Sequence, residues 1–392
     1  MAIIRNEQAG RKQGTFSRLS QPPMLFHRGV ASLAAVVYFV QGSLGIAGIA
    51  LPLYLRAQGF SIAKITFIGS VAAVPWFLKI VFGAISDAIP LWNLRRKPYL
   101  VICSILSCAG WLCLSVVPPT EAALIISMTI VNLGLAATDV IADGLIVEHS
   151  RRTSAQTYQS IAWGARSVGS VLSGFTGGIL AGELSAQTVF LITAGLPLIS
   201  LLASLFLKEK PYRKGSATKN IFRPIVKSVK CIVQRDLKWF IVFIFLISGS
   251  AAIGTPLFFY MRESLKFDEI SLGLLSSVTW LGAIVGCLLF LKFFKHSPMQ
   301  KTLYWAVGIG VVDILLTFLI QDYPSAFFVS VLLGVFGYLV LLPLFSAAAR
   351  FAHATGVESS LYAILMSLFN LGQAASSLLG GFLFEWIGLK LL

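Results

Sequence analysis

The sequence has 392 residues, of which 57% are hydrophobic and only 12% are charged, and its formal net charge is +15. Soluble domains are typically about 45–50% apolar and about 25% charged, so the composition excludes an ordinary soluble protein. It indicates an all-α membrane protein, because apolar runs of about 20 residues recur along the chain. The positive charge falls mainly in the loops between these runs, which is typical of membrane proteins and gives no reason to expect nucleic-acid binding.

The first segment, residues 1–30, is polar and basic and contains one acid, Glu7. It lacks the apolar stretch and the small-residue cleavage site of a secretory signal. A plastid transit segment is an alternative, but the segment is poor in Ser. We therefore expect a cytoplasmic tail.

Apolar windows of membrane-spanning length follow in chain order. Before residue 208 we expect six spans, near Ala31–Leu55, Ile65–Ser86, Tyr99–Val117, Ala122–Val147, Tyr158–Ala181 and Thr188–Leu207. After a basic linker over 208–238 we expect five more, near Trp239–Met261, Ser271–Phe294, Leu303–Ile320, Ala326–Ala349 and Ser359–Ile387. The sequence thus predicts about eleven transmembrane helices, six in an N-terminal half (31–207) and about five in a C-terminal half (239–392).

The loops differ in charge on the two sides of the predicted spans. The tail, the run Arg95–Lys97, the pair Arg151–Arg152 and the linker all fall on one side. The opposite loops contain little beyond Arg56, Lys64, Arg262 and Lys266. The positive-inside rule therefore places the N-terminus and the linker in the cytoplasm.

The two halves also resemble each other in sequence. Three short matches occur in the same order: GIAGIALPL with GSAAIGTPL, GFSIAKITFIGSV with KFDEISLGLLSSV, and RSVGSVLSGF with QAASSLLGGF. Spans one, two and five then correspond to spans seven, eight and eleven. Parallel repeats of this kind are typical of major facilitator transporters, whose substrate site lies between two helical halves. The counterpart of span six would begin where the sequence stops, so the repeat predicts that the twelfth helix is missing.

Four ionisable residues lie within the spans of the first half. An ionised side chain near the bilayer centre costs on the order of 2.5–3.5 kcal/mol, so each needs a reason to be there. Counting about 1.5 Å per residue from the cytoplasmic ends puts Lys79, Asp139 and Arg166 in one layer, roughly 12–15 Å deep. Asp143 lies one turn nearer the cytoplasm. We expect these cations and acids to neutralise one another while the site is empty.

This group of two cations and two acids predicts a substrate site. Arg166 offers a planar fork that can bind a carboxylate with two hydrogen bonds, and Lys79 adds a point charge. Asp139 and Asp143 can release a cation when substrate arrives or carry a coupling proton. The alternative is a structural lock between Arg166 and the acids that holds spans four and five together.

The corresponding layer of the second half is neutral and contains Asn370 and Gln373. Together with Gln41 in span one, these two amides are candidate substrate contacts. Asp313 in span nine is isolated, and we expect it to form a local lock. The five Cys show no metal-ligand spacing, and the chain has no catalytic triad, HExxH or Walker motif, so neither an enzyme, a metal site nor a cofactor is predicted.

The loop after span two is similar to the facilitator loop motif. Gly83 precedes Asp87 by one turn, and the basic run Arg95, Arg96 and Lys97 follows. In that motif Gly permits close helix packing and Asp binds the N-terminal end of a neighbouring helix. We expect these residues to stabilise one gate state, and an anchor at anionic headgroups is the alternative for the basic run.

Four segments together resemble the folate-biopterin transporter family, a branch of the major facilitators. They are YFVQGSLGIAG, PWFLKIVFGAISD, RRKPYL and TDVIADGLIVE, all in the first half. The resemblance implies transport of folates or pterins coupled to protons, with Lys79, Asp139, Asp143 and Arg166 at charged positions of the family's spans. Folate has two carboxylates and an aromatic pterin head, so it implies that Arg166 and Lys79 bind the carboxylates.

Several alternatives stay open at the level of sequence. The cargo could be another amphoteric metabolite, such as S-adenosylmethionine or a nucleotide, and a third hypothesis is a non-transporting sensor or degenerate paralogue. The chain is also shorter than is usual for the resembled family. We expect a monomer in a bacterial inner membrane, with a plastid envelope as the alternative.

Overall fold

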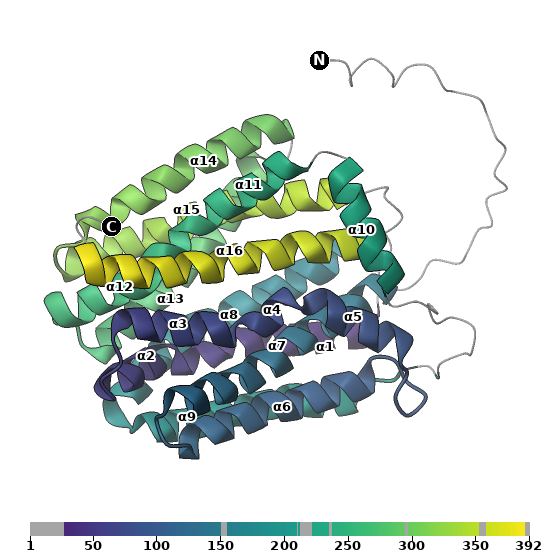
Figure 1. Cartoon of the computed structure of the whole chain (residues 1–392), viewed down its shortest axis with the longest axis horizontal. Helices are drawn as coiled ribbons and strands as arrows, with labels where there is room; N and C mark the ends of the chain where they lie inside the picture. The colour runs from purple at the N-terminus through teal and green to yellow at the C-terminus, as the bar shows by residue number, and fades with distance from the viewer. Residues whose placement is uncertain are drawn as a thin grey trace.

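The computed structural model describes residues 27–149, 155–209, 211, 222–234, 237–294, 297–352 and 358–388. Residues 1–26, most of the predicted cytoplasmic tail, lie outside these ranges. Arg151 and Arg152, two of the basic residues used to predict which side of the membrane is cytoplasmic, lie outside them as well. Within the described ranges the chain forms a bundle of helices and contains no β-strand (Figure 1).

The helices of the first half lie close to the predicted spans. Their bounds are α1 Arg28–Ser43, the 3-10 turn η1 Leu44–Ile46, α2 Ala47–Ala57, α3 Ile62–Ala72, α4 Val74–Phe77, α5 Lys79–Ala88, α6 Lys97–Val116, α7 Glu121–His149, α8 Ala155–Glu183 and α9 Ala186–Leu205.

The second half begins after a short helix that the sequence did not predict. Its elements are α10 Phe222–Gln234, α11 Lys238–Ile247, the 3-10 turn η2 Ser248–Ser250, α12 Ala251–Phe259, the π-helical turn η3 Tyr260–Ser264, α13 Glu269–Phe293, α14 Met299–Leu316, the 3-10 turn η4 Thr317–Leu319, α15 Tyr323–Ala352 and α16 Glu358–Ile387.

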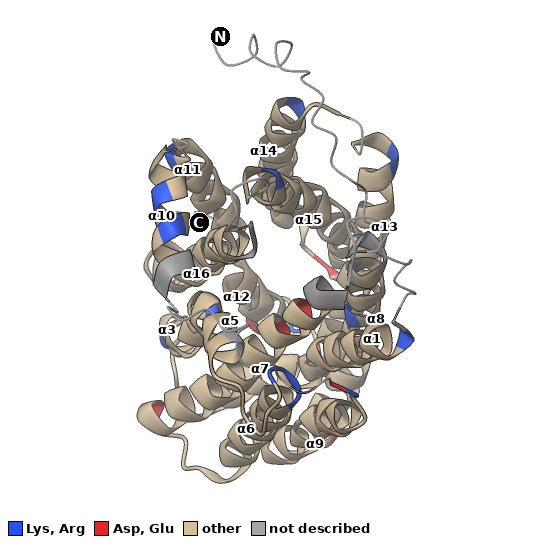
Figure 2. Ribbon diagram, turned by 90° about the vertical axis from the view of Figure 1, so that its right-hand side faces the viewer, with Lys and Arg blue, Asp and Glu red and all other residues tan. Residues whose placement is uncertain are grey.

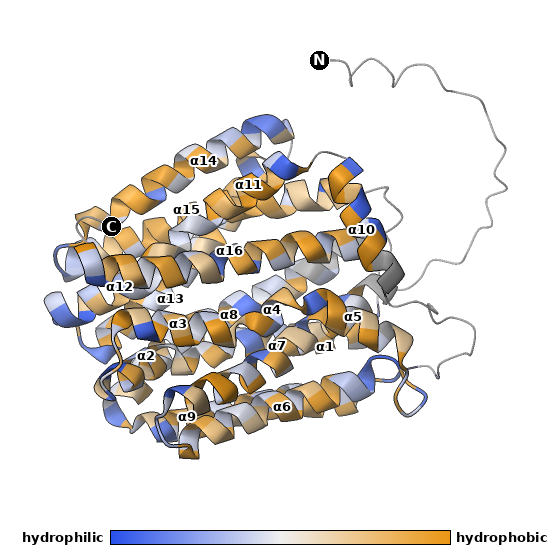
Figure 3. Ribbon diagram, in the orientation of Figure 1, coloured by the Kyte–Doolittle hydropathy of each residue, from blue (hydrophilic) through white to orange (hydrophobic). Residues whose placement is uncertain are grey.

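Nine helical segments among the described residues are long and apolar enough to cross a membrane. Two predicted spans are not among them: the second, which is broken into α3, α4 and α5, and the fifth, α8, which is rich in polar and small residues. Both pack in the bundle, α3 along α16 and α8 along α1 and α13. Figure 3 shows apolar residues along the helices and hydrophilic residues gathered near their ends. The all-helical membrane fold is thus confirmed, and the number of eleven spans stays a prediction.

The break in the second span positions the candidate site. Pro75 lies in the first turn of α4, and Leu78 separates α4 from α5 with a backbone outside the helical range. Proline has no N–H to continue a helix and restricts the residue before it. The break leaves Trp76 in the short helix α4 and makes Lys79 the first residue of α5.

Several features occur at equivalent places of the predicted repeat. The turns η1 and η2 interrupt the first and seventh spans at matching positions of GIAGIALPL and GSAAIGTPL, and each is followed by a proline, Pro52 or Pro256. The helices α3 and α13 both begin after a capping side chain, Ser61 or Asp268. The halves meet through α3 with α16 and α8 with α13, which are reciprocal pairs under the repeat. These observations support the two-half architecture, and the boundaries 31–207 and 239–392 stay predictions.

The contact between α8 and α13 depends on glycine. A Cβ added to Gly174 would lie 2.6 Å from the Ser277 Oγ, and one added to Gly178 would lie 2.6 Å from the Glu269 carbonyl oxygen. Small residues let helix backbones approach this closely in membranes. This close contact joins the two halves at the α8–α13 crossing.

The basic linker predicted over 208–238 includes the helix α10, which the sequence analysis did not identify. Ile225, Ser228 and Ile232 recur at helical spacing and face the protein. The basic residues between them lower the average hydropathy, which concealed this periodicity.

Candidate substrate-binding site

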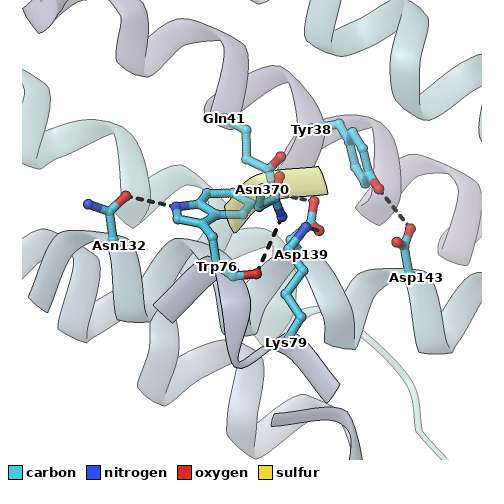
Figure 4. A network of polar contacts seen from close by, with 8 residues as sticks. All are labelled: Tyr38, Gln41, Trp76, Lys79, Asn132, Asp139, Asp143 and Asn370. Atoms are coloured by element: carbon cyan, nitrogen blue, oxygen red, sulfur yellow. Dashed lines mark hydrogen bonds and ion pairs between the residues drawn. The ribbon is translucent and has the colours of Figure 1, made fainter. Parts of the chain in front are cut away.

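An ion pair between α5 and α7 lies at the centre of the candidate site (Figure 4). The Lys79 Nζ is 2.7 Å from the Asp139 Oδ2, and the two side chains are only 16% and 8% exposed. The Gln41 Nε2 of α1 donates a second hydrogen bond to the Asp139 Oδ1 at 3.2 Å. Burying two charges is favourable only when geometry and additional hydrogen bonds compensate for lost hydration, and this pair has both.

Asp143 lies one turn further along the same face of α7. The Tyr38 hydroxyl of α1 donates a 2.7 Å hydrogen bond to the Asp143 Oδ1. Because Tyr38 and Gln41 are three residues apart on α1 and the two acids are four apart on α7, the contacts form two successive rungs between these helices. The two acids thus join α1 to α7.

Trp76 connects this pair to the second half of the molecule. Its indole Nε1 donates to the Asn132 Oδ1 of α7 at 2.8 Å, and its ring lies 4.5 Å from the Lys79 Nζ. The Asn370 Nδ2 of α16 donates to the Trp76 carbonyl oxygen at 3.3 Å (Figure 4). A neutral hydrogen bond therefore crosses between the halves directly beside the ion pair.

Arg166 lies near the pair but contacts no acid. Its guanidinium carbon lies 5.1 Å from the centre of the Trp163 ring, and the described residues give it no hydrogen bond or ion pair. The Trp163 ring in turn contacts the rings of Tyr38 and of Phe345 in α15, with centroid distances of 5.9 and 6.2 Å. Among the described residues Arg166 therefore forms no direct lock with the acids of α7, although it lies close enough to Asp139 for their charges to interact. The mutual neutralisation of the four charges stays a prediction.

A cavity of about 630 Å³ lies between the halves next to Trp76. It is lined by residues of α2, α3, α4, α7, α12 and α16, including the polar side chains of Ser70, Thr255, Asn370 and Gln373. This volume is in the range of about 300–1,000 Å³ that small-molecule pockets occupy. Of the predicted site residues, Asn370 and Gln373 line it. The cavity lining does not include Lys79, Asp139, Asp143, Gln41 or Arg166.

The predicted gate residues make contacts inside the first half. The Arg96 Nη1 donates to the Ser86 Oγ at 2.7 Å, and its guanidinium packs against Gly144 of α7. Gly83 lies so close to α7 that an added Cβ would be 3.1 Å from the Val140 Cγ1. These contacts tie the start of α6 and the end of α5 to α7.

The N-terminal end of α6 is bound by a residue that the sequence argument missed. The backbone N–H groups of Arg95, Arg96 and Lys97 all donate to the Glu209 carboxylate, at 2.7–3.2 Å. The Lys97 Nζ also donates to the Leu205 carbonyl oxygen at the end of α9. The side chain of Asp87, predicted to bind a helix N-terminus, is outside the described part of the structure. The signal for Glu209 was present, since it is an acid set between Lys208 and Lys210.

The predicted local lock at Asp313 is wrong. Its Oδ1 is buried in α14 and has no hydrogen-bond partner among the described residues. The error has a simple reason: depth along a helix predicts nothing about which side chains face each other across the neighbouring helices.

At the other end of the bundle, three basic residues that the sequence left unpaired have acidic partners. The Arg56 Nε is 2.6 Å from the Glu263 Oε1, which joins α2 to η3 across the halves. Lys64 pairs with Glu121 at 2.7 Å, and Arg262 pairs with Glu269. The Glu385 Oε1 of α16 accepts from the Ala63 N–H of α3 at 2.9 Å. Two polar contacts, Arg56 with Glu263 and Glu385 with Ala63, therefore connect the halves at this end.

These features define a class of protein. Two helical halves enclose a cavity between them, and a buried ion pair lies next to Trp76, one of the residues that line it. Solved structures with this fold include that of the nucleoside transporter NupG, which is 15% identical, has a TM-score of 0.72 and is matched over 92% of this chain and 91% of that chain. The chain has the major facilitator fold, as the sequence predicts.

Comparison with known sequences identifies the family. The model of the BT1 family matches residues 41–391, and the chain belongs to this family. A folate-biopterin transporter of Synechocystis sp. is 31% identical over 368 residues, covering 90% of this chain and 74% of that protein. The probable folate-biopterin transporter 4 of Arabidopsis thaliana is 26% identical, with 91% and 89% covered. The family consists of transporters and not of enzymes, in agreement with the sequence analysis.

Proposed function

We propose that this membrane transporter carries folate or pterin-type compounds by alternating access of its two halves. The observation that carries the proposal is the guanidinium of Arg166, which has no hydrogen bond or ion pair among the described residues and is held over the Trp163 ring beside a buried ion pair. A partly buried cation without an anion is costly unless a ligand supplies one. A carboxylate of folate meets that need with two parallel hydrogen bonds. The names of the relatives from Synechocystis and Arabidopsis support the same cargo.

The repeat assigns complementary roles to the halves. Arg166 and Gln373 occupy equivalent positions of RSVGSVLSGF and QAASSLLGGF, and Trp163 and Asn370 precede them by the same spacing. A cargo between the halves would meet a cation and an aromatic ring on one side and two amides on the other. Amides suit the donors and acceptors of a pterin ring. The Gln41 Oε1, which is buried and has no hydrogen-bond partner in the part of the chain that the structure describes, is a further acceptor nearby.

Asp139 and Asp143 are the proposed proton carriers. A carboxylate arriving at Arg166 adds negative charge beside both acids, which favours protonation of one of them. Each acid has an uncharged partner, Gln41 or Tyr38, that can bind its protonated form as well. Gly83, Asp87, Arg95, Arg96 and Lys97 are proposed to hold the cytoplasmic ends of α5, α6 and α7 together in one gate state.

The proposed setting is a bacterial inner membrane, with the N-terminus and the segment 208–238 in the cytoplasm and the chain acting as a monomer. The uneven distribution of basic loop residues supports this orientation.

Uptake of labelled folic acid into proteoliposomes, with and without an inward proton gradient, tests the proposal. Arg166→Ala is expected to lower uptake at least 100-fold, because removing a charged hydrogen-bond partner costs about 1.5–3 kcal/mol for each bond. The matched control is Arg350→Ala, which removes an exposed arginine near the end of α15. Gradient-independent or absent uptake by the folded parent protein would overturn the proposal and direct the assay to S-adenosylmethionine and nucleotides.

A further inference from the structure

The helix α10 has three distinct faces. One face packs on the protein: Ser228 is fully buried, and Cys231 and Ile232 contact a cluster that includes Leu361 and Leu365 of α16. With about 3.6 residues per turn, the other residues divide into two further faces. The side chains of both further faces are exposed.

The first exposed face is apolar. Val226, Val229 and Val233 are 52%, 49% and 75% exposed, and they fall within an arc of about 60° on the helix. The second exposed face is basic, with Lys230 about 70° and Lys227 about 130° away from the centre of the valine face. No acid occurs in α10. This arrangement of an apolar stripe beside a basic one is typical of helices that lie in a membrane interface.

The location of α10 fits the same interpretation. Figure 1 places it at the end of the bundle where α11 and α16 begin, and Figure 2, which looks at that end, shows its basic residues at the rim. Trp239 follows on α11 and is 71% exposed, and Leu246 continues the exposed apolar side of α11. Exposed tryptophans at helix ends mark the boundary between hydrocarbon and headgroups. The valine face of α10 is therefore close to the lipid boundary.

We propose that α10 binds the anionic surface of the bilayer. Val226, Val229 and Val233 enter the outermost apolar layer, and Lys227 and Lys230 bind the phosphates of acidic lipid headgroups. The buried face couples this contact to the start of α16, the helix that carries Asn370 and Gln373. The inference does not depend on the identity of the cargo.

The test measures which lipids lie beside α10 in the full-length protein. A fluorescent non-natural amino acid is introduced at position 233, which leaves the native cysteines in place, and the protein is reconstituted in mixed phosphatidylcholine and phosphatidylglycerol bilayers. Quenching by doxyl-labelled phosphatidylglycerol is compared with quenching by doxyl-labelled phosphatidylcholine. The same label at Gln234, on the polar side, reports whether the valine face in particular is in contact with lipid.

The expected result is strong quenching at position 233, weaker quenching at 234, and preference for the anionic quencher. Lys227→Gln with Lys230→Gln is expected to reduce that preference by up to about fivefold per lysine, equivalent to about 1 kcal/mol each. The control, Lys292→Gln with Lys301→Gln, removes two exposed charges around the turn between α13 and α14 and is expected to leave it unchanged. Equal quenching by both lipids, no quenching at 233, or the same loss in the control would each overturn the proposal.

Discussion

Replacing Lys79 by Met, and comparing the result with the replacement of Lys64 by Met, tests how strongly burial affects the stability of an ion pair within the first half. The Lys79–Asp139 and Lys64–Glu121 pairs have the same N–O distance of 2.7 Å, but their side chains are 16% and 8% exposed in the first and 40% and 39% in the second. Removing one partner of a buried pair costs about 3–5 kcal/mol. Removing one partner of an exposed pair costs about 1 kcal/mol or less. Lys79→Met should therefore destabilise the protein several times more than Lys64→Met.

The double variant Lys79→Met with Asp139→Leu tests the cause of that loss. It removes both charges, so most of the stability should return, because apolar residues often replace buried pairs without cost. A residual loss of about 1 kcal/mol is expected, since Gln41 loses the acceptor of its hydrogen bond. Folate uptake should be lost in the double variant even though stability returns, because the proposed site has lost two of its charges.

The free energy of unfolding is measured by denaturant titration of the purified protein in detergent. Folate uptake is measured in proteoliposomes. If Lys79→Met and Lys64→Met had equal effects, burial would not govern the strength of the pair and the reasoning would be refuted. If the double variant regained stability and also kept full uptake, the pair would be a structural contact only.

Three further predictions concern other residues. Asp139→Asn and Asp143→Asn should each reduce the ratio of uptake with and without an inward proton gradient, and an unchanged ratio in both would exclude their proton role. Glu263→Gln removes one charge of the exposed Arg56–Glu263 pair between the halves. A cysteine introduced in the cavity by Thr255→Cys should then react faster with a thiol reagent added on the Glu263 side than it does without Glu263→Gln, and equal labelling rates would contradict a gate there. Hydrogen bonds from the Ser271 side chain and backbone hold the pKa of Asp268 below its usual value, so its stabilising effect is present above about pH 4 and is lost as pH falls through the lowered pKa. The Asp268→Ala variant should accordingly lose less stability than the parent protein between pH 7 and pH 3, as measured by thermal unfolding. Identical losses would argue against the cap.

The sequence predicted the helices well because membrane spans depend on long apolar windows, which are local. It did not predict the break at Pro75, since the apolar window continues through it and only the missing N–H interrupts the helix. The basic helix α10 was missed for the opposite reason: its periodic apolar residues are diluted by lysines.

Within the site, the sequence predicted which residues share a layer better than the direction in which their side chains point. Lys79 and Asp139 were placed in one layer and do form a pair. Arg166 was placed in the same layer, yet its guanidinium turns to Trp163 on its own helix. Close contacts on two sides restrict the rotation of α8 about its axis: Gly42 of α1 lies against the Arg166 backbone, and Gly174 and Gly178 lie against α13. These contacts depend on helices about 100 or more residues away, which a reading of local pattern does not include.

The distribution of contact strengths favours halves that move as units. The buried pair Lys79–Asp139 lies within one half, and breaking such a pair costs about 3–5 kcal/mol. Several single contacts that cross between the halves are weaker: the aromatic pair Trp163–Phe345 and the neutral hydrogen bond from Asn370 are worth about 0.5–1.5 kcal/mol each. The exposed Arg56–Glu263 pair adds about 1 kcal/mol or less. Each of these crossing contacts thus costs less to break than the buried pair inside one half, whereas the close packing of α8 on α13 also joins the halves.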